Sequence, residues 1–134
     1  MISTQLARAL RDSGLEWRPR AGDAFRIDRI EADEEVYILS DMTVEAHDYG
    51  TGTVLGFNGT IEWALDSVAL DDALWLPQEH QLREFLASTF RSLTKAAGFV
   101  VTAEFEGQSY AFESDVAADA YARAALYLLD SLSV

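Results

Sequence analysis

The apolar residues of this chain follow two different periods, and this contrast constrains the fold more than any other feature. Between Phe25 and Trp63, apolar and polar residues alternate with a period of two, and β-branched and aromatic residues are frequent. That pattern predicts β-strands. On either side of this region, apolar residues recur at steps of three and four, which predicts amphipathic helices. The chain is therefore expected to belong to the α+β class.

A short helix is predicted near the start of the chain. Ser3 is a residue type that caps helices, and the apolar residues that follow it fall on one helical face. Gly14 suits the left-handed position that ends a helix, with Leu10 and Leu15 as the apolar pair of a Schellman ending. We therefore expect a helix of about ten residues that ends in a sharp turn.

An antiparallel β-meander of four or five strands is predicted for the central region. Asn58 and Gly59 form the strongest turn signal, because both tolerate the positive φ of a type I′ turn. Residues 66–74 show no clear period and receive no assignment. The predicted strands are residues 25–30, 35–39, 42–47, 53–57 and 60–65.

A long helix is predicted after Pro77, ending at Gly98. Its apolar positions recur at helical steps: Leu82, Phe85, Leu86, Phe90, Leu93 and Ala97. Pro77 suits a first helical turn because it has no N–H to satisfy there. The sequence therefore favours one continuous helix of about twenty residues.

A β-hairpin and a last helix are predicted for the C-terminal third. Gly107-Gln108 is read as a two-residue turn, so that Phe105 faces Tyr110 and Ala103 faces Phe112, and the apolar side chains of both strands share one face. The last helix is capped by Ser114 or Asp115. Its many alanines would let it lie close against a sheet.

These elements add up to a single α+β domain spanning residues 1–134. The order is an N-terminal helix, the meander of four or five strands, the long helix, the hairpin and the C-terminal helix. With 49% apolar residues the chain has enough material for a core. No repeat or linker divides it, and two placements of the hairpin stay open: it extends the meander sheet or forms a separate layer.

The charge distribution limits the classes of partner. The net charge is −13, and residues 30–82 contain twelve acidic residues but no Lys or Arg. A surface of this kind repels phosphate backbones, so direct nucleic-acid binding is not expected, whereas a basic protein partner is. There is no cysteine and no glycine-rich phosphate loop. No segment has the length of a membrane span, and no signal-peptide pattern is present, so we expect no membrane insertion and a cytoplasmic protein.

Few residues are candidates for chemistry. No catalytic, cofactor-binding or metal-binding residue is assigned, and no cofactor is expected. His47 and His80, with nearby carboxylates such as Glu84, would be needed for a small hydrolase or metal-dependent enzyme. The tryptophans are interpreted mainly as packing residues. The candidate binding residues are Asp41, His47, Asp48 and Trp63.

Several segments resemble a family of short actinobacterial proteins, some of which carry a pilus-assembly label. They are LSDMTVE at 39–45, GFNGT at 56–60, EWALDSV at 62–68, LWLP at 74–77 and QLR at 81–83. The resemblance covers most of the chain and implies no functional residue.

The sequence thus favours a non-enzymatic binding or accessory module that acts through a protein partner. The alternatives are a small hydrolase or metal-dependent enzyme using His47 and His80, and an accessory protein associated with pilus assembly. Formation of a homo-oligomer is left open.

Overall fold

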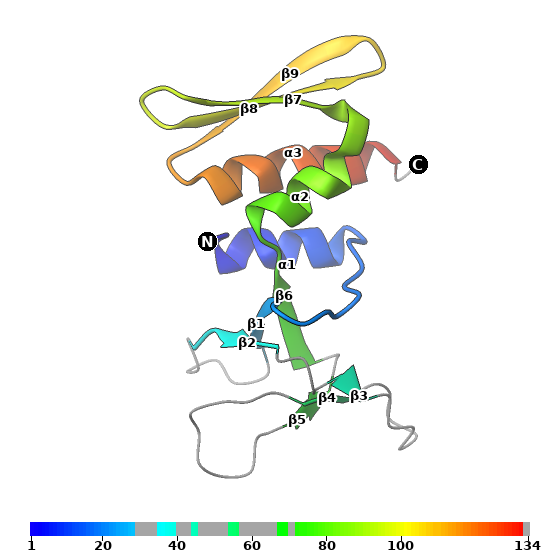
Figure 1. Ribbon diagram of the computed structural model, residues 1–134. Helices are drawn as coiled ribbons and strands as arrows, with labels where there is room; N and C mark the ends of the chain where they lie inside the picture. The colour runs from blue at the N-terminus through cyan, green and yellow to red at the C-terminus, as the bar shows by residue number, and fades with distance from the viewer. Residues whose placement is uncertain (29–34, 40–43, 46–53, 57–66, 70–71, 133–134) are drawn as a thin grey trace. The chain divides into compact units, whose positions relative to one another are not determined.

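The computed structural model describes residues 1–28, 35–39, 44–45, 54–56, 67–69 and 72–132 (Figure 1). These residues form three α-helices and three antiparallel sheets of three strands each, which confirms the α+β class. They group into two compact units, residues Met1–Glu16 with Pro77–Val134, and residues Trp17–Leu76. The single domain spanning 1–134 stays a prediction.

Helix α1 (Thr4–Asp12) begins and ends as predicted. The Ser3 hydroxyl oxygen accepts an N–H of the first turn at 3.3 Å. At the other end, the Leu15 N–H donates to the Leu10 carbonyl at 2.9 Å, and Gly14 has φ of 108°. This is the hydrogen bond of a Schellman ending, so the predicted turn is confirmed.

The predicted long helix is wrong beyond Leu86. Helix α2 spans Glu79–Leu86, a 3₁₀ turn follows at Ala87–Thr89, and the chain continues as strand β7 (Phe90–Lys95). Ala87 has φ of 51°, outside the helical region, so the helix stops there. The spacing of Phe90 and later apolar residues does not distinguish a helix from a strand, and pairing with the next strand decides between them.

Strand β7 is the first of three antiparallel strands in the order β7-β8-β9. Strands β8 (Phe99–Phe105) and β9 (Gln108–Ser114) form the predicted hairpin, but the turn is Glu106-Gly107 rather than Gly107-Gln108. Phe105 therefore pairs with Gln108, and Ala103 with Tyr110. Because the register differs from the predicted one by two residues, the apolar side chains still share one face.

Helix α3 (Ala117–Leu132) is the centre of this unit. It packs against β8 and β9 on one side and against α1 and α2 on the other (Figure 1). Tyr121 is fully buried, with the Phe90 ring at 5.6 Å and the Arg83 guanidinium donating to its hydroxyl at 3.2 Å. The Asp119 carboxylate accepts the Ser3 N–H at 2.7 Å, which ties α1 to α3.

The strands of the other unit do not form one meander. One sheet has the order β2-β1-β6 and the other β3-β4-β5. Strand β6 lies partly in the segment that received no assignment, because a strand buried on both faces is continuously apolar and shows no alternation. The bounds are β1 Ala24–Ile27, β2 Tyr37–Ile38, β3 Val44–Glu45, β4 Val54–Gly56, β5 Ser67–Ala69 and β6 Ala73–Leu76.

The pairing of β4 also differs from the prediction. An Asn58-Gly59 turn would pair residues 54–56 with residues 61–63, but β4 pairs with Ser67–Ala69, which the sequence left unassigned. The predicted turn itself and the predicted strand 60–65 lie outside the described residues.

A cluster of aromatic rings and one buried carboxylate organise the sheet that contains β1. Trp17 stacks on Trp75 at 6.3 Å and lies 5.7 Å from the Phe25 ring. Asp23 is only 4% exposed, and its Oδ2 accepts the Trp17 Nε1–H at 2.9 Å and the Arg20 N–H at 3.0 Å. The interpretation of these two tryptophans as packing residues is confirmed.

We predict that Asp23→Ala lowers the free energy of unfolding by about 2–3 kcal/mol, because it leaves two donors without their acceptor. The measurement is urea unfolding followed by tryptophan fluorescence. Asp12→Ala removes an exposed carboxylate that pairs with Arg11 at 3.2 Å and is the control, with an expected change within about 0.5 kcal/mol. Equal effects of the two substitutions would contradict this role of Asp23.

The Glu106-Gly107 turn supports a second prediction. Glu106 has φ of 52° and Gly107 has φ of 80°, as a type I′ turn requires at both central positions. Glu106→Asn should therefore raise the free energy of unfolding by about 0.5–1 kcal/mol, and Gly107→Ala should lower it by about 1 kcal/mol. Both changes are read from urea midpoints, and a lower midpoint for Glu106→Asn would show that the turn has another geometry.

Candidate protein-binding surface

The candidate binding residues predicted from the sequence, Asp41, His47, Asp48 and Trp63, all lie outside the described residues. His80 and Glu84 lie one turn apart on α2, and both are exposed. Within the described ranges, no group of three or more His, Cys, Asp or Glu side chains could hold a metal ion. No helix in this part of the chain is long and apolar enough to cross a membrane.

The most distinctive surface feature that the structure describes is a group of four rings, here called the aromatic cluster. It consists of Phe105 from β8, Tyr110 and Phe112 from β9, and Tyr127 from α3. Tyr127 is at its centre, with ring centroids 5.5 Å from Phe105, 4.9 Å from Tyr110 and 5.7 Å from Phe112.

The cluster follows from the alternation of side chains in the hairpin. Tyr110 and Phe112 lie on the face of β9 that α3 covers, because they pair with Ala103 and Val101 of the buried face of β8. Tyr110 and Phe112 are only partly buried there. Tyr127 is 39% exposed, whereas Phe105 is 8% exposed. The cluster therefore joins the core to the surface.

Two hydroxyl groups give the cluster a polar rim. The Tyr110 hydroxyl donates to Gln108 Oε1 at 3.1 Å. A hydrogen bond with the Tyr127 hydroxyl raises the pKa of Tyr110 above its ordinary value of 10.0, with smaller contributions from the loss of surrounding water and from the negative charge of Glu106. The Tyr110 hydroxyl is thus a neutral donor and acceptor at neutral pH.

The hairpin that supplies three of the four rings is acidic. The segment from Ala96 to Ala122, which contains the whole β8–β9 hairpin, has no Lys or Arg. Its five acidic residues are Glu104, Glu106, Glu113, Asp115 and Asp119. Of these, Glu106, Glu113 and Asp115 are exposed, whereas Glu104 pairs with Arg91 at 3.5 Å and Asp119 accepts the N–H at the start of α1. The hairpin that carries Tyr110 and Phe112 is thus anionic.

The sequence does not predict this surface as a candidate site. Its alternation puts Tyr110 and Phe112 on the apolar face of the hairpin, but it assigns no role to Tyr127. The signal was present in the sequence as two aromatic residues at alternate positions of a cation-free hairpin. What could not be predicted is that α3 brings Tyr127 over the same two rings.

Comparisons of the chain with protein-family models, with curated proteins and with solved structures find no match. The resemblance to short actinobacterial proteins therefore stays a prediction.

We predict that Tyr127→Phe moves the ionisation of Tyr110 to lower pH, because interaction with the Tyr127 hydroxyl is the largest cause of the raised pKa of Tyr110. A raised pKa in the folded state stabilises the fold at pH values below 10.0, and this contribution is lost as the pH rises through the folded-state pKa. The measurement is a titration of tyrosinate ultraviolet absorbance. Tyr110→Phe is the control that identifies its contribution among the five tyrosines; an unchanged titration would contradict the assignment.

Proposed function

We propose that the chain is a non-enzymatic binding module that acts through a basic protein partner, which it binds at the aromatic cluster and the adjacent acidic hairpin. The observation that carries this proposal is the exposure of Tyr127 at the centre of four rings beside a segment without cations. Aromatic residues contribute much of the binding energy at protein interfaces because they bury a large area with few rotatable bonds.

The charges select the class of partner. Glu106, Glu113 and Asp115 would attract a cationic protein surface and accelerate its association. The same carboxylates repel nucleic-acid phosphates and anionic lipid headgroups. The partner in this proposal is therefore a basic protein. The proposed location is the cytoplasm.

The test is fluorescence anisotropy with a labelled short peptide of alternating arginine and valine, and with a matched peptide of alternating glutamate and valine. We expect saturable binding of the basic peptide, weaker at higher salt, and no binding of the acidic one. Absence of saturable binding of the basic peptide, or equal binding of both peptides, would overturn the proposed function.

Two double variants, each of which removes two negative charges, test whether this surface binds the peptide. Replacing Glu106 and Glu113 by Gln should weaken binding of the basic peptide about fivefold, as expected for two partly screened charges beside the site. Replacing Glu79 and Glu84 by Gln on α2 removes the same charge elsewhere and should change binding by less than about twofold. Equal weakening by both pairs would show that the peptide responds to net charge and not to this surface.

A further inference from the structure

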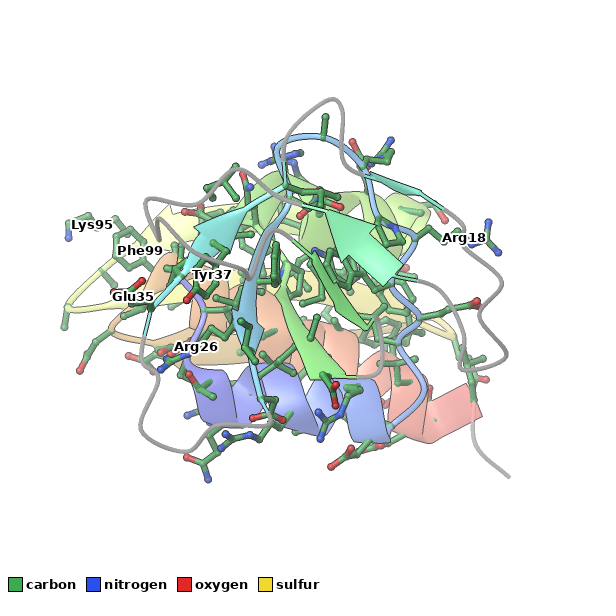
Figure 2. All side chains as sticks on the ribbon, turned by 90° about the horizontal axis from the view of Figure 1, so that it is seen from below. Arg18, Arg26, Glu35, Tyr37, Lys95 and Phe99 are labelled. Carbon is green, nitrogen blue, oxygen red and sulfur yellow. The ribbon has the colours of Figure 1, made fainter. Side chains whose placement is uncertain are left out.

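The two edges of the β7-β8-β9 sheet differ in how well they are protected from pairing with another strand. Strand β7 has a register shift between Phe90 and Ser92, and it carries Arg91 and Lys95. The Lys95 ammonium lies 4.6 Å from the centre of the Phe99 ring (Figure 2). Bulges and lysines are the usual features that prevent edge strands from pairing with other chains.

Strand β9 has none of these features. It pairs with β8 at seven successive positions without a register shift, from Phe99 with Ser114 to Phe105 with Gln108. It contains no Pro, Gly, Lys or Arg, and four of its residues are exposed: Gln108, Ser109, Ala111 and Glu113. It is therefore regular, seven residues long and open to pairing.

The register identifies which backbone groups of β9 point away from β8. A two-residue turn makes Phe105 and Gln108 a hydrogen-bonded pair, and such pairs alternate with non-bonded ones along antiparallel strands. Ser109, Ala111 and Glu113 of β9 therefore belong to the non-bonded positions, where N–H and C=O groups point outward from the sheet. These three residues form a row of outward donors and acceptors beside the aromatic cluster.

We propose that β9 is the docking strand of this protein, and that an extended basic segment of the partner adds to the sheet as its fourth strand. This inference rests on the proposed function and specifies its geometry. Alternate side chains of the added strand would lie toward Tyr127 and the rings of β9, and the others would lie on the opposite face near Glu113. Backbone hydrogen bonds would supply affinity, and the acidic residues would select arginine or lysine.

The negative charge of the hairpin favours a basic segment over a second copy of the chain as the added strand. Pairing of two β9 strands would bring two acidic hairpins together, each with Glu106, Glu113 and Asp115 and without Lys or Arg. A basic segment turns the same charges into attraction.

The test compares Ala111→Pro with Ala111→Val in the anisotropy assay with the arginine–valine peptide. Proline removes the outward N–H at a position that does not donate to β8, so the sheet should persist, whereas valine keeps the N–H and favours a strand. We expect Ala111→Pro to weaken binding at least tenfold and Ala111→Val to change it by less than about threefold. Circular dichroism of both variants monitors the fold.

Hydrogen exchange of the unmodified chain provides a second measurement that does not depend on folding of the proline variant. The amides of Ser109, Ala111 and Glu113 should exchange more slowly when the peptide is bound, and the amides of β7 should not change. A peptide with the same composition but with arginines and valines in separate blocks should bind more weakly, because it cannot alternate side chains across the strand.

Four results would overturn the inference. Equal binding by Ala111→Pro, or protection on β7 and not on β9, would exclude strand addition at β9 while the proposed function stands. Concentration-dependent dimerisation of the unmodified chain that Ala111→Pro abolishes would identify a second copy as the occupant. Failure of the basic peptide to bind the unmodified chain would overturn the proposed function itself, and this inference with it.

Discussion

The close packing around α3 is the constraint on which the rest of its unit, Met1–Glu16 with Pro77–Val134, depends. Six alanines occur between Ala117 and Ala125, and all six are buried. Because they cover more than one side of the helix, the sheet can approach from one direction and two helices from the other. Larger side chains at these positions would force the layers apart. Tyr121 is the single large buried side chain within this run, and it fills the space where Phe90 and Arg83 meet the helix.

This arrangement explains which parts of the fold the sequence could predict. Local signals act within a few residues, so the cap at Ser3 and the turn at Gly14 were predictable from their neighbours alone. The boundary at Leu86 was not, because helical spacing continues through Leu93 and only pairing with β8 makes that segment a strand. The positive φ of Ala87 could not be predicted from the sequence, because alanine is the best helix former and no helix-breaking residue occurs at this position.

In the unit Trp17–Leu76, too, the sequence predicts local structure but not which strands pair. Alternation predicted strands near Phe25 and Tyr37, but it cannot say which strands are neighbours. Strand β1 pairs with β6, almost fifty residues later along the chain, and β6 has no alternation because it is buried on both faces. Asp23 was equally unpredictable as a structural residue, because a carboxylate in a loop is normally solvated, and its burial depends on two donors supplied by the same loop.

The candidate surface combines two features: the open backbone edge of β9 and the negative charge of its hairpin. An open edge strand exposes a protein to pairing with copies of itself, and lysine is the usual protection on such edges. Strand β9 lacks lysine, but its hairpin is anionic, and like charges on two copies oppose their association just as cations would. The sign of the charge nevertheless matters for other partners, because an anionic edge admits a basic segment that a cationic edge would exclude. The acidic residues can thus keep copies of the chain apart and leave β9 available to one class of partner, which makes solubility and selectivity consequences of the same side chains.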